Sequence, residues 1–219
     1  MIGRYYSVGY NGGVEWDKDF AYVVGLIATD GNLSPDGRHL SLTSKDKELV
    51  LFVKKVLAPR AKVGIKKDRP HSPRRYYVVQ WSSREQYQYF CSIGITPKKS
   101  LTIKNIEVPQ PFYPHFLRGV FDGDGSFYSY YDKRWKNSYQ YYMVFASASK
   151  DFIQWIQATN HLYYKIKGHI SVGGAMFQLR YGKNESAVLF EKLYDFRSIL
   201  HLSRKRLKIE RALGIMRRG

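Results

Sequence analysis

The spacing of apolar residues in the first half of the chain alternates between helical and strand periods. Apolar residues recur at helical intervals from Phe20 to Ile27, after a capping residue at Asp17 and before a glycine at Gly31. Beyond this helix the pattern predicts a strand at residues 39–43, a helix at 46–57, strands at 61–67 and 75–82, and a helix at 84–93. We interpret the order as αββαββα, although the pattern locates only one of the two strands between the first two helices, and this order predicts an α+β fold.

The second half of the chain repeats this order. The predicted elements are a helix at 114–124, strands at 126–131 and 139–148, a helix at 149–163, strands at 169–172 and 176–181, and a helix at 185–196. The tripeptide that begins at Ser44 returns at Ser149, and Ser44 precedes Lys99 by 55 residues where Ser149 precedes Lys205 by 56. This spacing indicates an internal duplication, with repeats at 1–96 and 114–219 and a proline-rich linker at 97–113.

The first helix of each repeat ends in a similar nine-residue string, VVGLIATDG at 23–31 and LRGVFDGDG at 117–125. Gly25 and Gly119 hold the same position in the two strings, and each is followed four residues later by another small residue. Residues four apart lie on one face of a helix, so each helix presents a face that another helix backbone can approach closely. The strings therefore predict that the two helices pack through Gly25 and Gly119.

Such packing would bring together the aspartates at the ends of the two strings. Asp30 and Asp124 would then lie beside the unpaired backbone carbonyls of the last helical turns. Oxygen atoms from two chain segments suit a hard divalent cation, and an acid at the carboxyl end of a helix is unfavourable unless a cation compensates it. The predicted metal ligands are Asp30 and Asp124 with the adjoining Thr29 and Gly123. In the alternative interpretation, each aspartate only precedes the glycine that ends its helix.

The two strings resemble the signature motif of the LAGLIDADG homing endonucleases, and the resemblance extends over essentially the whole chain. It implies two pseudo-symmetric repeats packed through the motif helices, each with a curved four-stranded antiparallel sheet, that together form a DNA-binding saddle. It also implies catalytic roles for Asp30, Asp124, Lys99 and Lys205. The first string departs from the motif at Ala28, where the second has Asp122. The resemblance places the metal-binding acid at the eighth position of each string, which is Asp30 or Asp124, so we expect Asp122 to have a structural role or to support the metal ligands from behind. We expect Ser44 and Ser149 to cap the helices that follow them.

The charge balance points to a polyanionic partner. The chain has 219 residues with 36 Lys and Arg against 18 Asp and Glu, a net charge of +18. An excess of cations this large repels itself unless a partner such as nucleic acid offsets it. Cys91 is the only cysteine, which excludes an intrachain disulfide and a Cys-based zinc site. No long apolar run or export signal is evident, so we expect an intracellular protein without a membrane partner. The internal pseudo-twofold duplication leads us to expect a monomer.

Polar residues on and beside the predicted strands are the candidate DNA contacts. Arginine suits guanine and glutamine suits adenine in the major groove, but each can equally contact phosphate. The candidates are Arg38, Lys62, Lys66, Arg69, Arg74, Arg75, Gln80, Lys133, Arg134, Lys136, Gln140, Lys167, Gln178, Arg180 and Lys183. The tyrosine runs at 76–77 and 139–142 are interpreted as sheet packing rather than base stacking.

Together these features predict a site-specific endonuclease that hydrolyses double-stranded DNA at a long, pseudo-palindromic target. The resemblance implies dependence on Mg²⁺, with Mn²⁺ as a substitute and Ca²⁺ binding without supporting cleavage. A free-standing or intron-encoded origin is favoured over an intein. Two alternatives stay open: an RNA maturase or non-cleaving DNA-binding protein on the same fold, and a structural RNA-packaging protein explained by charge alone.

Overall fold

The computed structural model describes residues 15–67, 75–134, 138–194 and 199–216. Its first half contains α1 (Lys18–Thr29), β1 (Gly31–Leu33), β2 (His39–Ser44), α2 (Lys47–Leu57), β3 (Val63–Lys67), β4 (Arg75–Ser82) and α3 (Arg84–Ser92). Its second half contains η1 (Gln110–Phe112), α4 (Tyr113–Asp124), β5 (Ser126–Tyr131), β6 (Tyr139–Ser147), α5 (Lys150–Tyr164), β7 (His169–Gly173), β8 (Met176–Tyr181), α6 (Lys183–Tyr194) and α7 (Ser203–Met216). The predicted αββαββα order is confirmed in both halves, and α7 is an additional helix.

The strands form two four-stranded antiparallel sheets of the same topology. The strand order is β1-β2-β4-β3 in the first sheet and β5-β6-β8-β7 in the second, as expected of a duplication. In the first sheet Leu40, Leu42 and Val79 are buried on one face. Strand side chains alternate between faces, so the intervening residues lie on the opposite face. Each sheet thus has one face packed on helices and one open face.

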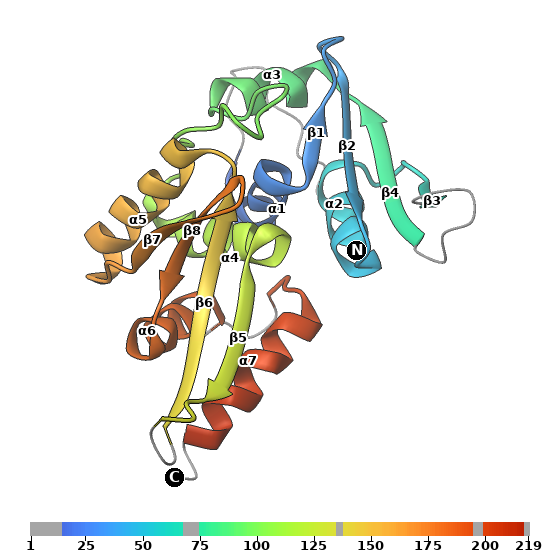
Figure 1. Cartoon of the computed structure of the whole chain (residues 1–219). Helices are drawn as coiled ribbons and strands as arrows, with labels where there is room; N and C mark the ends of the chain where they lie inside the picture. The colour runs from blue at the N-terminus through green and yellow to red at the C-terminus, as the bar shows by residue number, and fades with distance from the viewer. Residues whose placement is uncertain (1–14, 68–74, 135–137, 195–198, 217–219) are drawn as a thin grey trace.

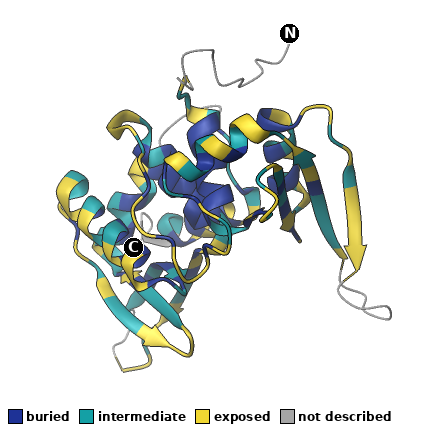
Figure 2. Cartoon of the chain, turned by 90° about the horizontal axis from the view of Figure 1, so that it is seen from above, coloured by how far each residue is buried: buried dark blue, intermediate teal, exposed yellow. Residues whose placement is uncertain are grey.

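Helices α1 and α4 lie side by side at the centre of the molecule, between the two sheets (Figure 1). The side chain of Asp17 caps α1 by accepting a hydrogen bond from the Phe20 amide at 2.8 Å, which confirms the predicted start of this helix. Residues 20 to 28 of α1 are all buried, and the buried residues gather around the two central helices in Figure 2. A helix that is apolar on every side in this way belongs to the core.

Three features differ from the sequence predictions. The first strand, β1, begins immediately after α1 and is only three residues long, too short to show a period. Helix α7 was not predicted, because its many basic residues hide the apolar stripe that buries Ile209 and Ala212. The tripeptide alignment is wrong by two residues, because Asp46 rather than Ser44 is the N-cap of α2 and corresponds to Ser149, the N-cap of α5.

The hydrogen bonds at these helix starts agree with the corrected alignment. Ser44 Oγ accepts from the Asp46 amide at 3.2 Å, and Ser147 Oγ accepts from the Ser149 amide at 3.1 Å. Ser149 also accepts from the Phe152 amide at 3.3 Å, so its predicted cap is confirmed. Ser44 stabilises the turn before its helix instead. The segment between α3 and α4 packs on the core through Ile95, Ile103 and Ile106, and its role as a linker stays a prediction.

Candidate active site

Helices α1 and α4 approach each other closely at the two glycines of the motif strings. A Cβ atom built on Gly25 would lie 2.2 Å from the carbonyl oxygen of Phe116, and one on Gly119 would lie 2.1 Å from that of Tyr22. Any larger residue would push the helices apart. One turn later a Cβ on Gly123 would lie 2.0 Å from Thr29 Oγ1. The predicted packing through Gly25 and Gly119 is therefore confirmed.

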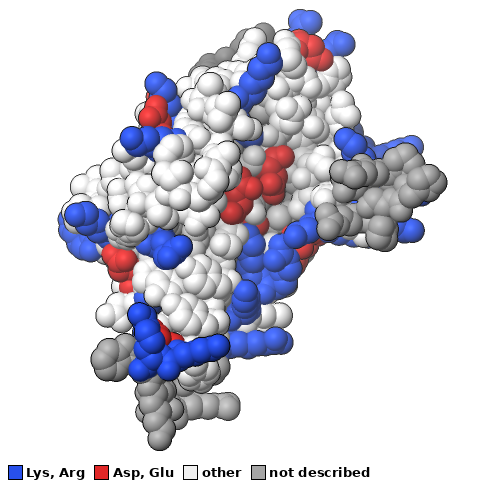
Figure 3. Space-filling model, in the orientation of Figure 1, with Lys and Arg blue, Asp and Glu red and all other residues white. Residues whose placement is uncertain are grey.

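This packing brings the two motif aspartates to the same end of the helix pair. Figure 3 shows an acidic patch in the middle of this face, over the ends of α1 and α4, with basic side chains below it. A depression of about 490 Å³ beside the patch is lined by Asp30, Asp46, Tyr76, Ser126 and Lys205 among others. Its walls come from both repeats, so the site lies at their junction.

The two carboxylates and two lysines of the site influence one another. Burial, followed by repulsion from Asp124, raises the pKa of Asp30 from its usual 3.8 to about 6, and Lys205 and Lys99 oppose this rise. Burial likewise raises the pKa of Asp124, against the attraction of Lys99 and Lys205. A cation bound between the acids would relieve this unfavourable arrangement.

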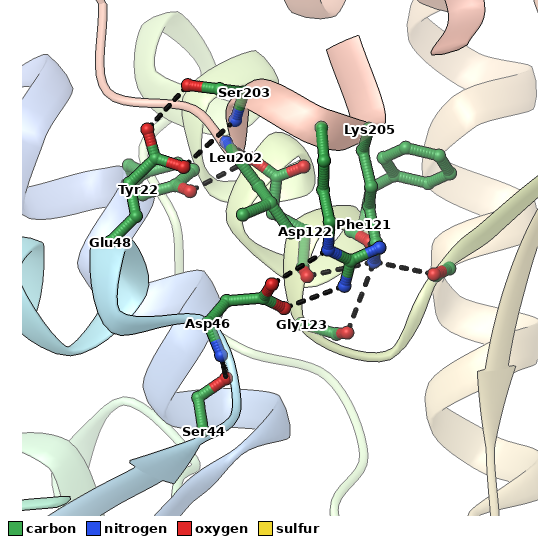
Figure 4. Close-up of polar contacts among 12 residues, drawn as sticks. Tyr22, Ser44, Asp46, Glu48, Phe121, Asp122, Gly123, Leu202, Ser203 and Lys205 are labelled. Atoms are coloured by element: carbon green, nitrogen blue, oxygen red, sulfur yellow. Dashed lines mark hydrogen bonds and ion pairs between the residues drawn. The ribbon is translucent and has the colours of Figure 1, made fainter. Parts of the chain in front are cut away.

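The predicted catalytic lysines lie beneath the aspartates with their amino groups buried against backbone carbonyls. Lys99 Nζ donates to the carbonyls of Thr29, at 3.1 Å, and Gly31. Lys205 Nζ donates to the carbonyls of Phe121, Asp122, Gly123 and Gly125, and its contact with Gly123 is visible in Figure 4. These carbonyls include the unpaired acceptors at the ends of α1 and α4. The two lysines therefore occupy equivalent positions, one in each repeat.

The two lysines differ in the number of polar contacts that their amino groups make. Lys205 has four carbonyl partners and lies 5.2 Å from the centre of the Phe121 ring. Burial lowers the pKa of Lys205 from 10.5 to about 8 although Asp122 raises it. Burial also lowers the pKa of Lys99, against attraction from Asp124 and Asp30. The two halves of the site are thus similar in plan but unequal in detail.

The residues present fit a hard cation held mainly by two carboxylates. Within the described ranges no group of three or more His, Cys, Asp or Glu residues could hold a metal ion. The carbonyls of Thr29 and Gly123, predicted as further ligands, already accept hydrogen bonds from Lys99 and Lys205. A carbonyl oxygen has a second lone pair and can still accept. Asp30 and Asp124 are therefore the principal candidate ligands, and a bound substrate would have to complete the coordination.

Asp122 has the structural role that the departure from the motif suggested. Its carboxylate is buried and accepts from Tyr22 Oη at 2.9 Å, Tyr194 Oη at 3.1 Å and the Leu202 amide at 2.7 Å. Burial raises the pKa of Asp122 despite these donors. Asp122 thus ties α4 to α1, to α6 and to the segment before α7.

The start of α7 is held by the first repeat, which the sequence analysis did not foresee. Arg204 donates to Asp46 at 2.8 and 2.7 Å, and Ser203 donates to Glu48 through its amide and its hydroxyl (Figure 4). Asp46 and Glu48 lie at the start of α2. No local signal could reveal these contacts, because the partners are more than 150 residues apart.

The alternation of side chains along each strand divides the predicted DNA contacts between the two faces of each sheet. The open face carries Lys66, Gln80, Gln140, Gln178 and Arg180. Turns, loops and element ends carry Arg38, Lys62, Lys133, Arg134, Lys167 and Lys183. Arg75 is placed differently from the prediction, since it shares the helix-covered face with Tyr77 and Val79. Arg69, Arg74 and Lys136 lie outside the described residues.

The tyrosine run at 139–142 is divided between the two faces. Tyr141 is buried in the core, as the packing interpretation expects. Tyr142 lies on the open face, where its ring stacks on that of Tyr128 at 5.1 Å. Period-two alternation explains the division, since adjacent strand residues point to opposite faces.

Comparison with known proteins agrees with this architecture. Residues 17–93, which span α1 to α3, match the family described as LAGLIDADG-like domain. Residues 17–93 therefore form a LAGLIDADG-like domain. No curated protein matches the chain at a significant level.

Solved structures extend the likeness of fold to the second repeat. The LAGLIDADG meganuclease I-AabMI bound to uncleaved DNA is 11% identical, with a TM-score of 0.63 over 91% of this chain and 90% of that one. I-DmoI in complex with DNA and Mn is 17% identical, with a TM-score of 0.54 over 82% of this chain and 98% of that one. Full-length DUF199/WhiA from Thermatoga maritima is 15% identical, with a TM-score of 0.55 over 92% of this chain but only 62% of that one. The chain therefore has the LAGLIDADG fold in a single-chain, two-repeat arrangement.

None of the helices in the described part of the chain has the length and apolar character needed to cross a bilayer.

Proposed function

We propose that this LAGLIDADG chain is a metal-dependent endonuclease that cuts double-stranded DNA at a long, pseudo-palindromic site. The observation that carries the proposal is the convergence of Asp30 and Asp124 at the junction of two antiparallel sheets, with a buried lysine behind each. The repeats supply one acid each. A duplex with two strands to cut matches this pseudo-twofold arrangement.

The two sheets are suited to a DNA duplex by their shape and charge. An antiparallel ribbon can enter the major groove, where side chains on alternate positions reach base edges. The net charge of +18 supplies the phosphate contacts that dominate DNA affinity. The I-AabMI and I-DmoI structures, which share this fold, contain DNA. Because one chain holds both repeats, we infer that it acts as a monomer.

Asp30 and Asp124 would hold a divalent cation, Mg²⁺ or Mn²⁺, whose chemistry is to activate water and neutralise charge on the scissile phosphate. Ionised carboxylates are required for this, so protonation of Asp30, whose pKa is raised to about 6, opposes metal binding at acidic pH. Lys99 and Lys205 place positive charge under the acids and offset the repulsion between the carboxylates and an incoming phosphate. Their carbonyl contacts fix both ammonium groups before substrate arrives.

The proposal is tested with a randomised library of duplex DNA in circular plasmids. Wild-type protein is incubated with the library in Mg²⁺ or in EDTA, and new ends are captured and sequenced. We expect ends that share a common sequence in Mg²⁺ and none in EDTA. Asp30→Asn and Asp124→Asn are isosteric controls that keep the helix packing, and each should abolish double-strand cleavage while DNA binding remains.

Two other outcomes would overturn the nuclease assignment. If the protein binds one DNA sequence selectively but no cleaved ends are found, the result would indicate the non-cleaving DNA-binding alternative. Ends that form equally in EDTA, or with both asparagine variants, would show that the aspartates do not act as proposed.

A further inference from the structure

The open face of the second sheet carries an ordered cluster of three tyrosines and one arginine. Tyr128 and Tyr142 are directly opposite each other on β5 and β6, with ring centres 5.1 Å apart and planes inclined by 24°. Tyr130 also stacks on Tyr142, with ring centres 6.2 Å apart and planes inclined by 16°. Arg180, on β8, places its guanidinium carbon 5.8 Å from the centre of both the Tyr128 and the Tyr142 ring.

This arrangement holds Arg180 without neutralising it. Within the described ranges Arg180 has no carboxylate partner, and its contacts are with the two rings. Cations within about 6 Å of a ring centre are attracted to its face, and Arg stacks on aromatic rings through its plane. The side chain is exposed, so its five N–H donors remain available to a ligand. Arg180 is therefore restrained in orientation before binding.

The position of the first sheet that is equivalent to Arg180 carries a different side chain. Counting from the equivalent residues Asp30 and Asp124, Asn32 corresponds to Ser126, and their strand partners Ser41 and Val144 correspond to each other. On the other side of its strand, Ser41 pairs with Gln80 of β4, and Val144 pairs in the same way with Arg180 of β8.

Gln80 and Arg180 are thus symmetry-equivalent positions on the two open faces. His39 of the first sheet corresponds to Tyr142, and it is bonded to Asp36 instead of stacking on a partner strand. The first sheet therefore lacks the tyrosine support that Arg180 has.

We propose that Arg180, positioned by Tyr128 and Tyr142, selects a guanine in one DNA half-site, whereas Gln80 selects an adenine at the equivalent base pair of the other half-site. The inference rests on the proposed function only in requiring that the open faces bind DNA. Arg donates two hydrogen bonds to the O6 and N7 atoms of guanine, and Gln exchanges two with adenine. The target is therefore unequal at this pair of positions. The tyrosine rings are positioning groups, because they reduce the side-chain freedom that Arg180 loses on binding.

The test is a binding selection, which does not depend on cleavage. A library of randomised duplexes is incubated in EDTA with wild-type protein, Arg180→Gln, Gln80→Arg or Lys150→Gln, and bound DNA is sequenced. Lys150→Gln is the charge-matched control, since Lys150 is exposed at the start of α5, on the helix-covered side. We expect Arg180→Gln to exchange one enriched guanine for adenine with a change in preference of about 10-fold to 100-fold, and Gln80→Arg to make the reverse exchange in the other half-site.

Two variants of Tyr142 separate positioning from general packing. Tyr142→Phe keeps the ring and should keep the guanine preference, whereas Tyr142→Leu should weaken that preference at this position only. Arg180→Gln could instead weaken binding to all sequences equally and reduce the slope of log affinity against log salt concentration by about one phosphate contact. Arg180 would then contact the DNA backbone, and the inference would be overturned. A wild-type selection without any enriched sequence would overturn site-specific binding itself, and the inference with it. Failure of cleavage in the plasmid test would leave this selection unaffected.

Discussion

Arg204 at the start of α7 and Asp46 at the start of α2 form a two-bond ion pair, at 2.8 and 2.7 Å, between residues 158 positions apart. The pair is adjacent to Lys205 in sequence and lies in the same depression as Asp30. The Arg204 guanidinium offsets the charge of the Asp46 carboxylate, which otherwise raises the pKa of Asp30. The pair therefore both anchors the additional helix and adjusts the charge of the site.

This pair predicts that Asp46→Asn and Arg204→Gln reduce cleavage without unfolding the protein. Exposed ion pairs contribute only about 0.2–1 kcal/mol to folding, so thermal stability should change little. Loss of the anchor should displace Lys205 and slow single-turnover cleavage by about 10-fold, equivalent to about 1.4 kcal/mol in the barrier. Arg206→Gln is the control, because Arg206 pairs with Glu210 inside α7. Equal loss in the control would show that the effect is one of charge rather than of anchoring.

Gly25→Ala should destabilise the fold although alanine favours helix. The new Cβ would meet the Phe116 carbonyl at 2.2 Å, and relieving such overpacking costs about 1–3 kcal/mol. Gly214→Ala in α7 is the matched control, since nothing lies within 4 Å of a Cβ there and the helix should gain about 0.5–1 kcal/mol. Urea unfolding curves measure both changes. A stabilising effect at Gly25 would contradict the close helix contact.

Asp122→Asn and Asp124→Asn should separate folding from chemistry. Asp122 accepts three hydrogen bonds in the core, and an amide nitrogen would oppose one donor, so this variant should lose about 1–3 kcal/mol of stability. Asp124 accepts no such hydrogen bonds within the described residues, so its asparagine variant should fold normally and fail to cleave. Cleavage at 10 °C, where both variants are folded, is the measurement. Equal loss of cleavage there would show that Asp122 also takes part in the reaction.

The raised pKa of Asp30 predicts the sign of a pH effect on stability. The folded protein binds this proton more tightly than the unfolded chain, so the associated stability is complete below pH 3.8 and is lost as the pH rises through about 6. Without metal, Asp30→Asn should therefore raise the melting temperature at pH 7 and lose this advantage toward pH 4.

Asp132→Asn provides a control of opposite sign. A hydrogen bond from Arg134 lowers the pKa of Asp132 to about 2, so its stabilising effect is present above the usual pKa and is lost as the pH falls through about 2. This variant should be slightly less stable than wild type at pH 7. A lower melting temperature for Asp30→Asn at pH 7 would contradict the charge balance described for the site.

Replacing Mg²⁺ with Ca²⁺ should separate DNA binding from cleavage. Ca²⁺ is a hard cation that accepts carboxylate oxygens, but it is larger and activates water less strongly. We expect tight DNA binding in Ca²⁺, measured by gel mobility, with no cleavage on the timescale of the Mg²⁺ reaction. Cleavage at the same rate in both ions would refute the role given to the metal.

Much of the fold could be predicted because the determining signals are local or repeated. The spacing of apolar residues locates α1 and β4, and Asp17 marks the start of its helix within a few residues. The duplicated strings predict that Gly25 meets Gly119, since a backbone contact of this kind requires glycine on both helices. The convergence of Asp30 and Asp124 follows from that contact.

Other features were decided by the tertiary structure. The face on which Arg75 lies depends on the register of β3 with β4, and an alignment of tripeptides could not reveal that Asp46 corresponds to Ser149. The pairing of Arg204 with Asp46 and the stacking of Arg180 on Tyr128 join distant segments. Such contacts carry no local period, because they arise where packed elements happen to meet. The sequence by itself therefore determined the elements, their duplication and the paired acids, and the packing of α7 and the pleat of the sheets determined the partners of each side chain.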